Sequence, residues 1–216
     1  IDTIDFLKSN HYNLTDAIDL GIIDTGTNGL YSRVIERITF PIYSINGKLV
    51  GFGGRTITGH SAKYINSPQT KLFNKSRLLY GYQIAKEQIY KKKQIIVCEG
   101  YLDVIMLHQA GFNTSVATLG TALTVEHLPL LRRGDPKVIL AYDGDKAGLA
   151  AAFKAAVMLS QSDFEGGVII FSDAQDPADM VKANKIEELN EMFFNPISFI
   201  PFSIDYIVSK YDINEP

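Results

Sequence analysis

The stretch that decides the fold is IIVCEGYLD, residues 95–103, in which an apolar run ends in an acid and a glycine. A short apolar run bounded by polar residues predicts a buried strand, and the residues after the glycine have the pattern of a helix. Two later apolar runs also end in acids, VILAYDGD at 138–145, which again has a glycine beside the acids, and VIIFSD at 168–173. Three such runs predict a sheet with carboxylates along one edge.

Strands and helices alternate from residue 93 to residue 183, with short connections between them. This alternation predicts an α/β fold, in which a parallel sheet is flanked by helices on both faces. The expected strands are 95–98, 115–119, 137–142 and 168–171, and the expected helices are 101–110, 124–133, 146–160 and 177–183.

The segments on either side have different patterns. The first 30 residues are predicted to form short helices, with Asn13 or Thr15 as a cap, and Asn46-Gly47 is typical of the turn of a β-hairpin. The hairpin strands are expected at 38–45 and 48–54, and further helices at 76–93, 186–195 and 203–210. The expected subdomains are a basic α+β part at 1–92, the α/β part at 93–180 and the start of a helical part at 181–216.

Acidic residues follow the strands of the predicted parallel sheet. Because the carboxyl ends of parallel strands meet at one edge, we expect these side chains to crowd a common rim. The four acids expected there are Glu99, Asp143, Asp145 and Asp176. Crowded carboxylates repel one another unless a cation neutralises them, and hard oxygen donors favour Mg²⁺ or Mn²⁺.

Other interpretations of these acids exist. A carboxylate at a strand–helix junction also caps the helix; Asp173 is assigned to that role, and Asp103 and Asp179 either cap a helix or support the metal ligands. An apolar strand ending in Asp-x-Asp also begins the haloacid dehalogenase-like phosphatase fold, but Lys146 and Glu99-Gly100 do not fit that pattern. A non-catalytic, metal-stabilised binding module is a third possibility.

The net charge of −3 hides an uneven distribution. Residues 33–93 hold twelve Lys and Arg against two acids, a net charge of +10, and the other residues sum to −13. Arg55, Lys63 and Lys75 lie among glycines, aromatics and turn residues rather than on a polar helix face, which favours phosphate binding over a solvated surface. The single cysteine, Cys98, excludes an internal disulfide and a multi-cysteine zinc site, and no apolar run is long enough for a membrane helix.

Residues 99–103 and 143–145 together resemble the Toprim domain, which primases, type IA and II topoisomerases and some nucleases share. The stretches 117–121 and 142–148 resemble the branch of bacterial replicative primases, of DnaG type. The basic segment adds further matches to the N-terminal subdomain of that family, at 33–41, 51–55, 63–68, 75 and 79–81. The resemblance covers most of the chain.

The resemblance implies a DNA-directed RNA polymerase that makes RNA primers on single-stranded DNA, with other Toprim enzymes as the alternative. It implies that Glu99, Asp143 and Asp145 are catalytic and hold Mg²⁺ or Mn²⁺, and that Asp176 supports them, with a general acid or base as the alternative role of Glu99. The residues expected to contact template or nucleotide are Arg33, Arg55, Lys63, Tyr64, Asn66 and Lys75. Asp103 and Asp179 are possible supporting residues.

The partners implied are the DNA template, ribonucleoside triphosphates and, through the full-length protein, the replicative helicase and the single-strand binding protein, with no membrane. The implied location is the cytoplasmic bacterial replisome at the nucleoid. Since the chain starts at Ile1, we expect a fragment without the family's zinc-binding and helicase-binding domains, and zinc only in the former. One departure concerns the third acidic motif, where Ala178 replaces the second aspartate of the usual Asp-Pro-Asp.

Overall fold

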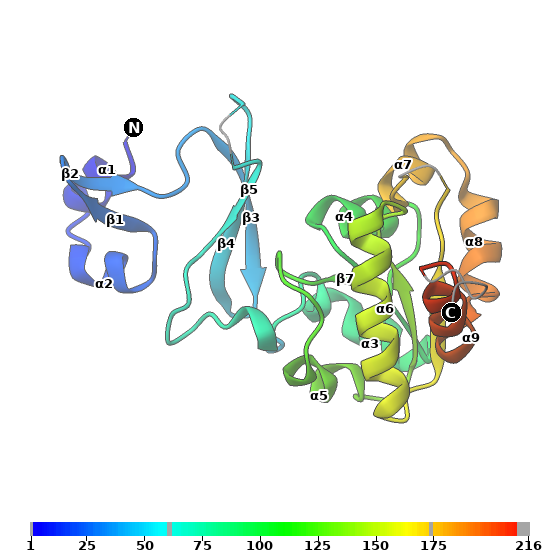
Figure 1. Ribbon diagram of the computed structural model, residues 1–216. Helices are drawn as coiled ribbons and strands as arrows, with labels where there is room; N and C mark the ends of the chain where they lie inside the picture. The colour runs from blue at the N-terminus through cyan, green and yellow to red at the C-terminus, as the bar shows by residue number, and fades with distance from the viewer. Residues whose placement is uncertain (1, 60–61, 173–174, 211–216) are drawn as a thin grey trace. The chain divides into compact units, whose positions relative to one another are not determined.

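The computed structural model describes residues 2–59, 62–172 and 175–210, and the chain divides into two compact units (Figure 1). Unit 1 comprises residues 1–78 and unit 2 residues 79–216. The mixed α/β architecture confirms the predicted fold class, and the predicted subdomain boundaries at 92 and 180 stay predictions.

Unit 1 begins with two short helices and a two-stranded antiparallel sheet. Its elements are α1 (Thr3–Ser9), α2 (Leu14–Asp19), β1 (Ile23–Gly26) and β2 (Gly29–Ser32). Asn13 caps α2 by accepting a hydrogen bond from the backbone of Thr15, as the sequence predicts. The prediction of helix is wrong for residues 23–30, because Gly29, at a φ of +102°, supports a turn that pairs the two strands.

A three-stranded antiparallel sheet forms the rest of unit 1. Its strands are β3 (Arg37–Tyr43), β4 (Leu49–Thr56) and β5 (Tyr64–Asn66), in the order β3-β4-β5, and the 3₁₀ helix η1 (Lys75–Arg77) follows. The hairpin prediction is confirmed, and Gly47 adopts a φ of +77° in its turn. Gly51 lets the ring of Phe73 lie on β4, because a Cβ there would stand 2.8 Å from that ring.

Unit 2 is a five-stranded sheet covered by helices. Its elements are α3 (Tyr82–Lys92), β6 (Gln94–Cys98), α4 (Tyr101–Gln109), β7 (Ser115–Ala117), η2 (Val125–His127), α5 (Leu128–Leu131), β8 (Lys137–Ala141), α6 (Lys146–Gln161), β9 (Gly166–Ile169), α7 (Pro177–Lys182), α8 (Ile186–Phe194), β10 (Ile197–Ser198) and α9 (Phe199–Val208). The strand order is β10-β9-β8-β6-β7, parallel throughout except for the short edge strand β10.

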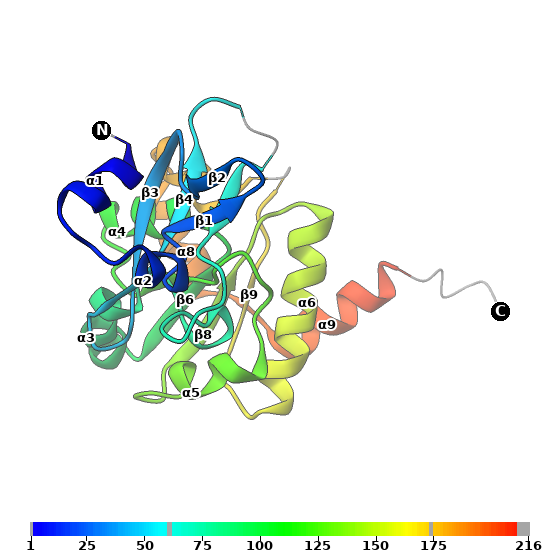
Figure 2. The same ribbon diagram turned by 90° about the vertical axis from the view of Figure 1, so that its left-hand side faces the viewer.

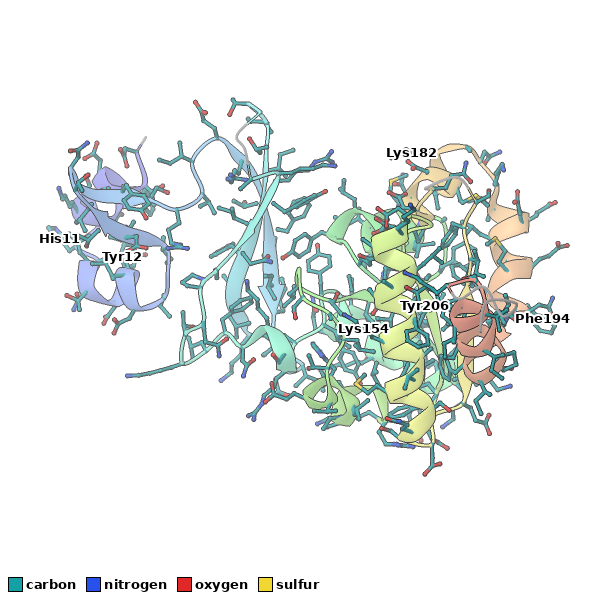
Figure 3. All side chains as sticks on the ribbon, in the orientation of Figure 1. His11, Tyr12, Lys154, Lys182, Phe194 and Tyr206 are labelled. Carbon is teal, nitrogen blue, oxygen red and sulfur yellow. The ribbon has the colours of Figure 1, made fainter. Side chains whose placement is uncertain are left out.

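The order of the strands places a topological switch point between β6 and β8. From β6 the chain passes through α4 to β7 on one side, and from β8 it passes through α6 to β9 on the other. Right-handed crossovers in opposite directions put α4 and α6 on opposite faces of the sheet. The face of α4 also carries α7 and α8, whose Met180 and Leu189 share one buried core with Ile96 and Ile139. On the other face α9 lies against α6, where Tyr206 stacks on Phe153 at 4.6 Å between ring centroids (Figures 2 and 3).

Several elements of unit 2 differ from the sequence prediction. The helix expected at 76–93 is wrong in its first part, because Tyr80 pairs with Ala117 and α3 starts only at Tyr82, and the helix expected at 124–133 is divided into η2 and α5.

Strand β9 starts at Gly166 rather than Val168, because glycine lets it approach β8 so closely that a Cβ at Gly166 would stand 1.8 Å from the carbonyl oxygen of Val138. Residues 197–198 form the edge strand β10, and the last helix starts at Phe199 rather than Ser203. A two-residue antiparallel pairing carries too little pattern to be predicted.

Candidate functional site

The crevice at the switch point between β6 and β8 brings two of the predicted acids together. Glu99 follows the end of β6, and Asp143 comes two residues after the end of β8. The backbone N–H of Asp143 donates a hydrogen bond to Oε1 of Glu99 at 3.2 Å. Both side chains are only partly exposed. Ligands of open parallel sheets bind at such a position.

Two glycines allow this close packing. A Cβ at Gly148, in the first turn of α6, would stand 2.2 Å from the carbonyl oxygen of Asp143 and 2.9 Å from Oε1 of Glu99. A Cβ at Gly144 would stand 2.3 Å from the carbonyl oxygen of Phe171, after β9. The loops after the three strands therefore lie against one another only because these positions have no side chain.

The remaining two predicted ligands each cap a helix. Oδ1 of Asp145 accepts the backbone N–H of Gly148 at 2.7 Å at the start of α6, and Oδ1 of Asp176 accepts that of Asp179 at 2.6 Å at the start of α7. Asp145 is exposed and Asp176 half-buried. A carboxylate has two oxygens, so capping through one oxygen leaves the other available to a cation.

The two possible supporting residues have different surroundings. Asp103 is 6% exposed, and its Oδ2 accepts the backbone N–H of Gly100 at 3.1 Å. Asp179 has a half-exposed side chain that pairs at 2.9 Å with Lys182 of α7, the residue labelled in Figure 3. Asp173, which the sequence assigns to a helix cap, lies outside the described residues.

Glu99 and Asp103 hold their protons more tightly than isolated carboxyls do. Burial raises the pKa of Glu99, and the charge of Asp143 raises it further. Burial raises the pKa of Asp103 to about 7, with added repulsion from Asp176 and Asp143. The carboxylates therefore lie close enough for their charges to repel one another. A cation bound among them would offset this repulsion and lower their pKa values.

The donor set at the rim fits a hard divalent cation in its chemistry. The acids supply oxygen donors alone, and the one cysteine nearby, Cys98, is buried with a pKa well above its ordinary value because of that burial. Among the described residues no group of three or more His, Cys, Asp or Glu side chains is placed to hold a metal ion as it stands. Side chains such as Asp145 would therefore have to turn toward a bound cation.

Unit 1 brings several of the predicted template-binding residues together on β4 and β5. Arg55 of β4 pairs across the sheet with Tyr64 of β5, and its guanidinium lies 5.7 Å from the centre of the Tyr64 ring. The amine of Lys63 lies 5.9 Å from the same ring. We call Arg55, Lys63 and Tyr64 the β4–β5 basic cluster.

The other predicted template-binding residues lie elsewhere in unit 1. Arg33 forms an ion pair with Asp24 and lines a cavity of about 140 Å³ together with Asn66. Lys75 is the first residue of η1, a separate element. The roles of these six residues, like those of the acids, stay predictions.

The sequence reasoning missed one residue next to the acids. Tyr142 immediately precedes Asp143, and its hydroxyl is buried without a hydrogen-bond partner among the described residues. Burial raises its pKa, and the charge of Glu99 adds to this. An aromatic residue at the end of an apolar run gives no signal of an unpartnered hydroxyl.

Comparison with protein families identifies two matches. Residues 2–86 match the model of the N-terminal domain of the DNA primase catalytic core, and residues 93–170 match that of the Toprim domain.

Curated relatives match nearly the whole chain. The DNA primase of Helicobacter pylori strain J99 is 52% identical over 212 residues, which is 97% of this chain and 38% of the relative. The DNA primase of Campylobacter jejuni is 48% identical, over 98% of this chain and 35% of the relative. The chain thus spans little more than a third of the length of these relatives.

Solved structures agree in fold. The RNA polymerase domain of Mycobacterium tuberculosis primase DnaG superposes with a TM-score of 0.87 at 32% identity, covering 96% of this chain and 70% of that one. A DnaG primase catalytic domain bound to single-stranded DNA gives 0.87 at 34% identity, covering 97% and 68%.

Proposed function

The chain belongs to the family of bacterial DNA primases, and on this premise we propose that it is the catalytic core of an enzyme that synthesises RNA primers on single-stranded DNA. The observation that carries the proposal is the pairing of Glu99 with Asp143 at the switch point of the sheet. That pairing sits in the segment that matches the Toprim domain. In the reaction a 3′-hydroxyl attacks the α-phosphate of a ribonucleoside triphosphate, so that a phosphodiester bond forms and pyrophosphate and the hydroxyl proton leave.

The acids of the rim have distinct proposed roles. Glu99 and Asp143 bind the metal from the crevice, and Asp145 binds it with the oxygen that is not engaged in capping α6. Asp176 supports them from the start of α7. When bound, Mg²⁺ or Mn²⁺ would lower the pKa of the attacking hydroxyl and neutralise charge on the triphosphate.

Unit 1 supplies the proposed contacts to template and nucleotide. The β4–β5 basic cluster combines two cations with an exposed aromatic ring, which suits a phosphate backbone with a base or sugar stacked beside it. Arg33, Asn66 and Lys75 add polar and charged groups for the same ligands. A solved relative bound to single-stranded DNA supports the choice of template.

The full-length protein is proposed to act at the bacterial replisome, with the replicative helicase and single-strand binding protein as partners. Support comes from the family alone. No helix among the residues that the structure describes is long and apolar enough to cross a membrane.

Extension of an RNA primer annealed to single-stranded DNA tests the proposal. Wild type, Asp143→Ala and Glu187→Gln would each be supplied with ribonucleotides and either Mg²⁺ or Mn²⁺. Glu187 is an exposed acid on α8 and serves as the matched control. We expect extension by wild type and the control, and a loss of at least 100-fold in Asp143→Ala. Equal rates in all three would overturn the metal assignment, and nicking of DNA without extension would favour another Toprim enzyme.

A further inference from the structure

Asp103 differs from the other acids of the rim in what its carboxylate touches. The side chain projects from the first turn of α4 and is 6% exposed. Its Oδ2 accepts the backbone N–H of Gly100, in the loop that carries Glu99, at 3.1 Å. The backbone of Ala178, in the first turn of α7, lies near this carboxyl and acts to lower its pKa.

The two loops next to Asp103 are far apart in sequence and each carries a proposed ligand. Gly100 directly follows Glu99, and Ala178 comes two residues after Asp176. The helices behind the loops pack together, since α4 contacts α7 and their Val104 and Met180 share one buried core. One buried carboxylate therefore lies between two ligand-bearing loops.

The local sequence is adapted to this arrangement. A Cβ at Gly100 would stand 3.0 Å from Oδ2 of Asp103, so a side chain there would press on the hydrogen bond. Ala178 is buried, at 2% exposed, so the residue that replaces the usual aspartate fits into the core with its backbone near Asp103. A ligand of a catalytic cation must reach the open rim, and the burial of Asp103 is unfavourable for that role.

We propose that Asp103 is a positioning residue that holds the Glu99 loop by its hydrogen bond to Gly100 and, through its buried place between α4 and α7, ties that loop to the Asp176 loop, and that it is not itself a metal ligand. The proposal rests on the proposed function of the rim. A positioning residue and a metal ligand give opposite changes in stability when the side chain is removed in the absence of metal. Removing a positioning residue destabilises the protein even without metal, because the N–H of Gly100 loses its acceptor and a buried side chain is lost from between α4 and α7. Removing a pure ligand relieves repulsion when metal is absent.

The test compares Asp103→Ala, Asp103→Asn and Asp143→Ala. The first readout is the midpoint of urea unfolding in EDTA at pH 6. We expect a lower midpoint for Asp103→Ala, and one that is unchanged or higher for Asp143→Ala. Asp103→Asn should recover part of the loss, since the amide oxygen accepts one N–H. An Asp103→Ala variant as stable as wild type would overturn the proposal.

The second readout is Mn²⁺ affinity, measured by calorimetry. A residue that only stabilises the fold would leave this affinity unchanged in both variants, whereas a positioning residue should lower it in Asp103→Ala and restore it in Asp103→Asn. Loss of support for metal ligands typically weakens binding by 10–100-fold. We expect a weakening of about that size for Asp103→Ala and a recovery to within about threefold of wild type for Asp103→Asn. Equal loss in both variants at unchanged EDTA stability would identify Asp103 as a ligand. If wild type bound no Mn²⁺, the proposed function would fail. The stability measurement in EDTA would still test whether Asp103 holds the two loops together.

Discussion

At the scale of the residue, the hydroxyl of Tyr142 is a local weakness of the fold. It is buried without a partner among the described residues, and an unsatisfied buried polar group destabilises the native state. We expect Tyr142→Phe to raise the free energy of unfolding by about 1–2 kcal/mol in EDTA, measured by urea titration. Tyr82→Phe is the matched control. The hydroxyl of Tyr82 donates to the carbonyl of Leu130 at 3.1 Å, so its removal should lower the free energy of unfolding. Destabilisation of both variants would contradict the interpretation.

The carboxyl of Asp103 predicts a pH dependence of stability. Its pKa is about 7 in the folded chain against an ordinary 3.8, so the folded state holds the proton more tightly. Well below pH 3.8 both states are protonated and no penalty exists. As pH rises to 7 only the unfolded state ionises, and stability falls by about 4 kcal/mol at most.

Asn at position 103 cannot ionise, which isolates this effect. In EDTA, we expect the stability of wild type relative to Asp103→Asn to decrease steadily between pH 4 and pH 8. Urea titrations at closely spaced pH values measure that difference. A difference independent of pH would show that the carboxyl titrates normally.

At the scale of the element, the first turn of α6 packs on the loops of the rim through Gly148. A methyl group there would meet the carbonyl of Asp143 at 2.2 Å and Glu99 at 2.9 Å. We expect Gly148→Ala to destabilise the protein by about 1–3 kcal/mol and to weaken Mn²⁺ binding, measured by urea titration and calorimetry. Ala147→Ser, which adds one atom at the exposed neighbouring position, should change neither quantity. Normal metal affinity in Gly148→Ala would argue against close packing here.

The β4–β5 basic cluster predicts a salt-dependent affinity for single-stranded DNA. Each phosphate contact contributes about 0.7 to the slope of log affinity against log salt. We expect the double substitution Arg55→Ala and Lys63→Ala to lower affinity and reduce that slope by about 1.4, measured by fluorescence anisotropy. Lys71→Ala, an exposed lysine of the same unit, should leave both nearly unchanged. Loss of affinity with an unaltered slope would exclude phosphate contact by the cluster.

Patterns that recur within one element could be predicted from sequence, and pairings between elements mostly could not. The alternation around 95–103 predicts β6 and α4, and the acids at strand ends predict the rim. The crevice depends on β6 and β8 being neighbours, and this order is set by the direction in which each crossover connection runs along the sheet, which no local pattern shows. Likewise no local pattern shows that Asp103 lies near Ala178, since the two belong to segments about 75 residues apart.

At the scale of the whole molecule, charge and ligands are divided between the two units. Residues 1–78 carry nine Lys and Arg and six Asp and Glu, a net charge of +3, and residues 79–216 carry twelve and eighteen, a net charge of −6. All proposed metal ligands belong to unit 2, and the β4–β5 basic cluster belongs to unit 1. A divalent cation should therefore stabilise one unit selectively, whereas single-stranded DNA should affect the other.

Hydrogen exchange with and without Mg²⁺ measures that selectivity. A ligand present at 100 times its dissociation constant stabilises the state that binds it by about 2.7 kcal/mol. Because the proposed ligands follow three different strands, opening any of their loops breaks the site, so β6, β8 and the start of α7 should gain protection together. Strands β3 to β5 of unit 1 should not change, and Asp143→Ala should abolish the gain. Equal protection of both units would mean that the cation acts on the molecule as a whole, and the assignment of the metal to the rim would then be wrong.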